Sequence, residues 1–306
     1  MRALLGCYVL AFLLGRTVAA EPANYDPERA SAHLSKLVGQ PWLSAWKEAR
    51  VSDIRLVEPK NGGDGSQKKW WAKVEGPNGA SGHLCWAASG DGLLEEFAFD
   101  AALEFDSDNA KAIKGVPNVQ QFPIVDQDGA KVASGCVPTA GASVVGFWMS
   151  NGFPQWRGSA GQNPLLDITE RLRGQMRIEV IPDTDGFVNG EMSLAGASPL
   201  GLYAAILADA KAHNVALEGS WGRGDFGDIK REIESGSPVL LSCYVPLPQK
   251  PELSWPHQVV GVGWARVGEL DFVGIVDNFF PTRSASTIRW IRATAFNFML
   301  IIRPQK

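Results

Sequence analysis

A short segment of the chain combines the residue types that nucleophilic chemistry needs. Residues 134–140 read SGCVPTA, so Cys136 follows a glycine and precedes an apolar run. Glycine lets the backbone turn tightly before a helix, and the positive end of a helix dipole lowers the pKa of a cysteine thiol placed there. Backbone amides of the first turn can also stabilise an oxyanion. The segment predicts Cys136 as a nucleophile; the alternative is a cysteine that only packs beneath a helix start.

A histidine that opens an apolar strand is the predicted base. His257 begins the run HQVVGVG at residues 257–263. A Cys–His pair is the minimal activated nucleophile, and the 121 positions between Cys136 and His257 suit partners that meet only in the folded chain. The alternative is a histidine that is satisfied in the core or at a cap.

A polar pair after the next apolar run offers the third member of a triad. Asp277 and Asn278 directly follow residues 274–276, GIV. A side chain there can accept a hydrogen bond from the imidazole and fix its tautomer. We predict Asp277 for this role, because a carboxylate also stabilises imidazolium, with Asn278 as the alternate. A turn-forming Asp-Asn pair is the structural alternative.

Glutamines that precede the cysteine are candidates for the oxyanion site. A side-chain amide can donate the second hydrogen bond to an oxyanion. In the loop at residues 116–123 we predict Gln121 for this role, with Gln120 or Gln127 as alternates.

The elements that would position these residues form an α+β unit at residues 116–306. Helices are expected at 136–149, 164–176, 197–213 and 225–235, and strands at 238–245, 257–264, 272–276, 286–291 and 297–303. Helices therefore come first and an antiparallel sheet follows, with the nucleophile on the first helix of the core and the base on a strand.

A smaller α+β unit is predicted at residues 21–105. One helix at 26–50 precedes short β-like runs at 54–57, 70–74, 82–86 and 93–99, which Gly-, Asn- and Asp-rich turns separate. The polar residues 106–115 are predicted to form a linker between the two units.

Composition and the first residues predict an exported globular protein. Hydrophobic residues make up 45% of the 306 residues and the net charge is -4, so no nucleic-acid or anionic-membrane partner is indicated. Residues 1–20 combine a basic start, an apolar run and small residues before Glu21, which is the plan of a signal peptide. We expect periplasmic or extracellular localisation and no membrane association after cleavage.

The remaining cysteines and histidines do not indicate a metal site. Cys85, Cys136 and Cys243 remain after signal cleavage, an odd number that leaves at least one thiol unpaired. A Cys85–Cys243 disulfide and three free thiols both stay open. No cluster has the spacing of a zinc site, so neither a metal nor another cofactor is expected.

Together these segments resemble the papain-like cysteine peptidases typified by the double-glycine leader peptidases of bacteriocin exporters, in a stand-alone secreted branch. The matching segments are residues 116–117 with a following glutamine, 135–139, 236–239, the strand from His257, and 277–278. The GCVPTA sequence is more weakly similar to streptopain-like secreted peptidases. The resemblance implies a papain-like fold with Cys136 as nucleophile, His257 as base and Asp277 as orienting residue.

The expected function is therefore hydrolysis of peptide bonds in a peptide or protein substrate through a thioester acyl-enzyme. A non-catalytic peptide-binding module on the same fold is one alternative, and another acyl-transfer enzyme, an amidase or transglutaminase, is the other. Residues 21–105 are expected to be either an inhibitory prodomain, released by cleavage in the linker, or a permanent accessory domain. A Cys85–Cys243 disulfide would favour the permanent domain.

Overall fold

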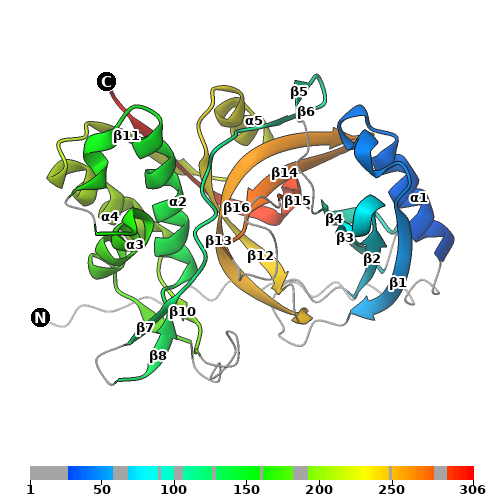
Figure 1. Ribbon diagram of the computed structural model, residues 1–306, viewed down its shortest axis with the longest axis horizontal. Helices are drawn as coiled ribbons and strands as arrows, with labels where there is room; N and C mark the ends of the chain where they lie inside the picture. The colour runs from blue at the N-terminus through cyan, green and yellow to red at the C-terminus, as the bar shows by residue number, and fades with distance from the viewer. Residues whose placement is uncertain are drawn as a thin grey trace, which may run out of the picture.

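The computed structural model describes most of the chain beyond its first segment (Figure 1). The described residues are 27–57, 68–88, 91–99, 106–125, 129–158, 161–181, 192–247, 250–278 and 288–306. The predicted signal peptide, at residues 1–20, lies outside them. Within these ranges, no helix has the length and apolar character needed to cross a bilayer.

A 12-stranded antiparallel sheet is the framework of the molecule. Its strands are β1 (Arg50–Val57), β2 (Lys69–Glu75), β3 (Ser81–Ala87), β4 (Leu94–Phe99), β5 (Asp106–Ser107), β6 (Ala110–Ala112), β11 (Leu217–Gly222), β12 (Val239–Leu247), β13 (Lys250–Val267), β14 (Leu270–Val276), β15 (Arg289–Arg292) and β16 (Phe296–Pro304). They are hydrogen-bonded in the order β1-β2-β3-β4-β15-β14-β13-β12-β16-β11, and the β5–β6 hairpin joins β13. Two small hairpins stand apart from this sheet: β7 (Pro123–Val125) with β8 (Lys131–Ala133), and β9 (Glu179–Val180) with β10 (Ala195–Gly196).

Helices cover the sheet in separate places (Figure 1). They are α1 (Pro27–Val38), α2 (Cys136–Ser150), α3 (Pro164–Gly174), α4 (Pro199–Ala212) and α5 (Phe226–Glu234), with short 3-10 turns η1 (Pro41–Trp46), η2 (Pro77–Gly79), η3 (Pro154–Arg157) and η4 (Ala293–Ala295). The cluster of α2, α3 and α4 lies at one end of the molecule, and α1 with β1–β4 lies at the other. The molecule is a mixed α+β structure with a large antiparallel sheet, as the sequence predicts at that coarser level.

Alternation of side chains along the central strands gives the sheet two apolar faces. Leu240 and Val260 are directly opposite each other and pack in the core cluster of α2. Leu241 and Val259, the next pair, pack in the cluster of α5. Strands buried on both sides carry continuous apolar runs, which explains why residues 238–245 and 257–264 are recognisable as strands in the sequence.

Helix α2 is buried on nearly all sides. Eleven of its 15 residues are buried, and the helix packs against β13, β12, α3 and α4. Its small residues permit this close contact: a Cβ added at Gly141 would lie 2.6 Å from a methyl carbon of Leu202. The helix that carries Cys136 is therefore held rigidly against the sheet.

Residues 27–99, here called the N-terminal unit, contain the predicted helix and four antiparallel strands. The helix is shorter than the expected 26–50: α1 ends at Val38, and Pro41 begins the separate turn η1. Proline lacks the amide hydrogen that a continuing helix needs. Aromatic side chains of this unit, including Trp46, Trp86 and Phe97, form a buried cluster that also contains Phe272 and Trp290.

The predicted linker at 106–115 contains strands β5 and β6. Ala112 is paired with Gly263, and Ala110 with Ala265, so β6 extends the ladder of β13. In addition, β4 is paired with β15. The sheet thus runs without a break from the N-terminal unit into the C-terminal strands.

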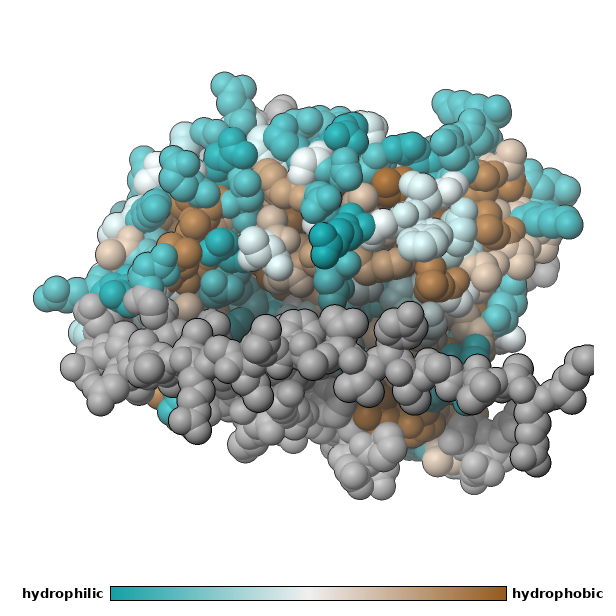
Figure 2. Space-filling model, turned by 180° about the vertical axis from the view of Figure 1, so that it is seen from behind, coloured by the Kyte–Doolittle hydropathy of each residue, from teal (hydrophilic) through white to brown (hydrophobic). Residues whose placement is uncertain are grey.

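On the face seen from behind, hydrophilic residues predominate along the outer edge of the described part, with smaller hydrophobic patches between them (Figure 2). Residues of both kinds therefore occur on this surface, as on most globular proteins.

Candidate active site

Cys136 is the first residue of α2, as the sequence predicts. Gly135 precedes it with a φ of 94°, a left-handed conformation that favours glycine. The hydroxyl of Thr139, one turn into the helix, donates to the carbonyl oxygen of Gly135 at 2.5 Å. This contact fixes the turn that presents the cysteine, which is half-buried.

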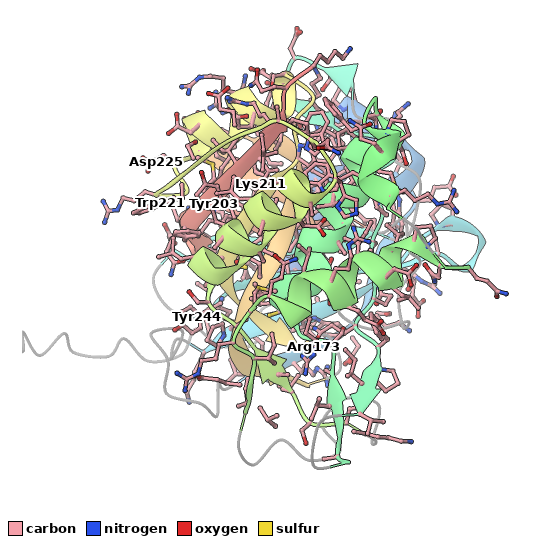
Figure 3. All side chains as sticks on the ribbon, turned by 90° about the vertical axis from the view of Figure 1, so that its left-hand side faces the viewer. Arg173, Tyr203, Lys211, Trp221, Asp225 and Tyr244 are labelled. Carbon is pink, nitrogen blue, oxygen red and sulfur yellow. The ribbon has the colours of Figure 1, made fainter. Side chains whose placement is uncertain are left out.

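An arginine from α3 holds the segment that leads to the nucleophile. Arg173 Nη1 donates to the carbonyl oxygen of Ser134 at 3.0 Å and reaches that of Ala133 at 3.5 Å. The side chain extends from the end of α3 at the lower part of the helical cluster (Figure 3). The sequence does not predict this role, because Arg173 lies far along the chain from residues 133–134 and no motif links them.

Backbone amides surround the thiol of Cys136. The N–H groups of Gln258, of Cys136 itself and of Val137 all lower the pKa of this thiol, but burial outweighs them and raises it overall. This differs from the sequence-based expectation of a lowered pKa, because helix amides act here on a thiol withdrawn from water. The contact with the Gln258 amide places Cys136 beside the residue that follows His257.

His257 lies in β13, buried, directly opposite Cys243 of β12. The two side chains consequently share one face of the sheet. A charge on Cys136 contributes to the raised pKa of the Cys243 thiol, so both thiols belong to the same neighbourhood. The contact of the thiol with the Gln258 amide therefore places Cys136, at the N-terminus of α2, next to the middle of β13 and one residue along that strand from His257.

The hydrogen bond of the His257 ring defines its tautomer. Nε2 lies 2.5 Å from the backbone carbonyl oxygen of Asp277. A carbonyl can only accept, so Nε2 carries the proton and Nδ1 of the neutral ring keeps its lone pair. Burial lowers the pKa of His257 to about 4, against the opposing effects of that hydrogen bond and the charge of Asp277. The ring is thus a neutral base in the folded protein near pH 7.

Asp277 reaches His257 through its backbone, whereas the sequence analysis expects its side chain to do so. Its carboxylate instead accepts a hydrogen bond from Arg289 Nη1 at 2.8 Å. Both residues are buried. The guanidinium therefore holds the side chain of Asp277, while the carbonyl of the same residue orients the imidazole.

Asn278, the alternate for the orienting role, lies in a left-handed conformation with φ 56° and is fully buried. Its backbone N–H donates to Asn118 Oδ1 at 3.2 Å, and its carbonyl accepts from the Gln121 amide at 3.3 Å. Within the described part of the chain, no hydrogen bond reaches its side-chain Oδ1 or Nδ2. Asn278 therefore ties the strand end to the loop that precedes the nucleophile.

That backbone contact brings Gln121 to the site. Gln121 is buried, and the next residue, Phe122, exchanges hydrogen bonds with Ser134, donating to Oγ at 3.2 Å and accepting from the amide at 2.8 Å. Gln121 is therefore adjacent to Phe122, which is hydrogen-bonded to Ser134, and Ser134 lies two residues before Cys136. Its Oε1 atom has no hydrogen-bond partner among the described residues.

The other glutamines are placed less favourably for an oxyanion role. Gln120 is half-buried, and its Oε1 likewise finds no described partner. Gln127 lies outside the described residues. The sequence does not show which of the adjacent residues Gln120 and Gln121 lies closer to the site. In the structure, it is Gln121 whose backbone amide contacts Asn278.

The three described cysteines are free thiols. Burial raises the pKa of the Cys85 thiol to about 12 and also raises that of Cys243. The disulfide between Cys85 and Cys243, one of the two alternatives left open, is absent from this structure. In the described ranges, no three His, Cys, Asp or Glu side chains converge as metal ligands would.

Comparisons with known proteins do not assign a family. No family model matches the sequence, and no curated protein matches it significantly. The site must therefore be interpreted from its own geometry.

Proposed function

We propose that this chain is an exported cysteine peptidase of the papain-like class, with Cys136 as nucleophile and His257 as general base. The observation that carries the proposal is the placement of Cys136 at the start of α2, beside the Gln258 amide, with a His257 ring whose proton is on Nε2. General-base activation of a cysteine requires a neutral imidazole that can take up a proton, and with the Nε2 proton held by Asp277 the nitrogen that can do so is Nδ1.

The proposed reaction begins from a neutral pair. His257 takes the proton from the Cys136 thiol as sulfur attacks the carbonyl carbon of a peptide bond. The oxyanion that forms accepts hydrogen bonds from the Cys136 backbone amide and the Gln121 side chain. As the C–N bond breaks, His257 returns the proton to the leaving amine, and the acyl group remains on sulfur as a thioester.

Water completes the proposed cycle. His257 takes a proton from a water molecule, whose oxygen attacks the thioester carbonyl. The C–S bond breaks, the carboxylic acid leaves, and His257 returns its proton to the sulfur, which restores the thiol and the neutral imidazole. Asp277 keeps the ring in one tautomer through its backbone carbonyl, the role that the third member of a triad performs.

The proposal is tested by activity assays on the purified protein with three separate substrates: peptide libraries, a glutamine-containing peptide as acyl donor with a primary amine as acceptor, and peptidoglycan fragments. Peptide hydrolysis that Cys136→Ala abolishes and Cys243→Ala preserves would support it. Turnover of only the second or third substrate class would assign the site to a transglutaminase or an amidase. Peptide binding without turnover of any substrate would identify a binding module.

A further inference from the structure

Buried ionisable side chains run from the N-terminal unit to the candidate active site. In order they are His83, Glu96, Arg289 and Asp277, and the backbone of Asp277 then meets His257. We call the first four residues the charge chain. None of them is more than 6% exposed.

The central contact of the charge chain is a two-pronged ion pair. Arg289 Nε donates to Glu96 Oε1 at 2.9 Å, and Nη2 donates to Oε2 at 3.0 Å. The third nitrogen, Nη1, donates to Asp277 Oδ2 at 2.8 Å. Glu96 and Asp277 therefore hold the guanidinium between them, in the planar geometry that makes arginine–carboxylate pairs strong.

Neighbouring strands supply these residues in succession. His83 lies on β3, Glu96 on β4, Arg289 on β15, Asp277 at the end of β14 and His257 on β13, and these strands are consecutive in the sheet. Arg289 is paired with Ala98 and with Ile275, which are two residues from Glu96 and Asp277 respectively. Side chains two residues apart share a face, so the sheet itself aligns the charges.

Glu96 matters because it accepts hydrogen bonds from two of the three nitrogens of a buried guanidinium. Burial alone lowers the pKa of Arg289, but the charges of Glu96 and Asp277 more than offset this and raise it. Without the carboxylate of Glu96, Asp277 would still balance the charge of Arg289, but Nε and Nη2 would lose their charged acceptor in a site closed to water, which is strongly unfavourable. The guanidinium, and with it the carboxylate of Asp277, would then be held less firmly.

Apolar contacts reinforce the same junction. Phe97 follows Glu96 on β4. Its ring is stacked on Trp290, with 6.0 Å between the ring centroids, and meets Phe272 edge-on, with 5.1 Å between the centroids. All three rings are fully buried. Removal of the N-terminal unit would expose these rings together with an arginine that has lost its Glu96 partner.

In its described residues, the N-terminal unit does not lie over Cys136, as an inhibitory propeptide would. In the sheet, β15 and β14 separate β4 from β13, and the described part of the unit lies at the end of the molecule away from α2 (Figure 1). An inhibitory propeptide works by lying over its nucleophile. The described strands of this unit instead extend the sheet that carries the base.

We infer that the N-terminal unit is a permanent structural part of this protein and that Glu96, acting through Arg289, is a positioning residue for Asp277 and His257. The second half of this inference rests on the proposed function. It selects the permanent domain over the releasable prodomain, and it gives that domain a task at the active site.

Permanence is tested by cutting the full chain once. A specific protease site is inserted between residues 100 and 105, the protein is cleaved, and the products are passed through a size-exclusion column. The expected result is that the two fragments elute together and separate only in denaturant. Elution as two separate species, with a soluble catalytic fragment, would overturn the inference whether or not the protein has peptidase activity.

Positioning is tested with Glu96→Gln, which keeps the shape of the side chain and removes its charge. The matched control is Glu95→Gln. The side chain of Glu95 is 30% exposed, and its Oε1 lies 3.8 Å from Nη1 of Arg292. The tautomer of His257 is followed by nitrogen-15 NMR of the imidazole, and the rate of thiol labelling at Cys136 is measured in parallel. Glu96→Gln should mix the two tautomers and slow labelling at least tenfold, while Glu95→Gln should change neither.

The outcomes separate the two proposals. If wild-type Cys136 is not selectively labelled, the proposed function fails, but the tautomer of His257 still reports on Glu96. If wild type is labelled and Glu96→Gln leaves both tautomer and rate unchanged, the positioning role is wrong and the peptidase proposal stands. Because the cleavage experiment leaves Glu96 in place, it decides permanence even if Glu96→Gln does not fold.

Discussion

At the scale of single residues, the site rests as a neutral pair. Burial raises the pKa of the Cys136 thiol and lowers that of His257 to about 4. The thiol is therefore protonated and the imidazole is neutral before substrate arrives. In the proposed reaction, the proton therefore moves from Cys136 to His257 during attack, and the carbonyl oxygen of Asp277 orients the imidazole.

The lowered pKa of His257 makes folding stability depend on pH. Its folded value of about 4 lies below the ordinary 6.5, so the unfolded chain binds more protons between these limits. Stability should therefore fall as pH drops from about 6.5 to 4, by up to roughly 3 kcal/mol from this residue. Urea unfolding of wild type and His257→Gln at a series of pH values measures the effect, which the variant should lack. Parallel curves for the two proteins would show that His257 is not buried as a neutral ring.

At the scale of elements, the start of α2 concentrates the chemistry. One glycine with positive φ, one buried hydroxyl contact and an arginine from α3 fix the residues before Cys136. The first turn of the helix then provides amides near the sulfur. The conformation of Gly135 is therefore part of the site.

Gly135→Ala should disturb both folding and chemistry. At a φ of 94° an added Cβ is strained, and it would lie 3.3 Å from the carbonyl oxygen of Ala195. The strain should cost roughly 1–3 kcal/mol in unfolding free energy, and the labelling rate of Cys136 should fall. Gly174→Ala, at the end of α3 with no atom within 4 Å of its added Cβ, is the control. Equal effects of the two substitutions on labelling would contradict a special role for Gly135.

Periodic segments of the sequence predict their elements well. The helices expected at 136–149, 164–176, 197–213 and 225–235 correspond to α2–α5, and the four strands of the N-terminal unit to β1–β4. The strand β11 was missed, because its sequence LEGSWG has two glycines and no alternation of apolar residues. The length of β13 was underestimated, since Pro251 and Pro256 suggest breaks there.

At the scale of the whole molecule, one sheet and a shared aromatic cluster unite the two predicted units. The sequence correctly indicates Cys136 at a helix start and His257 on a strand, because both depend on local pattern. It gives no sign of the Glu96–Arg289 pair, whose members are 193 residues apart. It also cannot reveal that Asp277 uses its carbonyl toward His257, since side-chain and backbone acceptors look alike in a sequence.

A continuous sheet predicts cooperative unfolding. Far-UV and near-UV circular dichroism in urea should show coincident transitions for this protein. Trp290→Ala removes a fully buried ring that contacts Phe97 and Trp42. This substitution should lower the free energy of unfolding by about 3–5 kcal/mol and move the single midpoint to a lower urea concentration. Two separate transitions, only one of them moved by Trp290→Ala, would show that the units fold independently.

The claim on which the rest depends is that His257 activates the Cys136 thiol. The direct test is labelling of the purified protein with the epoxide E-64 or with iodoacetamide at mildly acidic pH, followed by peptide mass mapping. Wild type is compared with His257→Ala, and the buried Cys243 is the internal reference for an ordinary thiol. We predict selective modification of Cys136 that is lost in His257→Ala. Equal labelling of Cys136 in both proteins, or none in either, would contradict the account and favour a binding module.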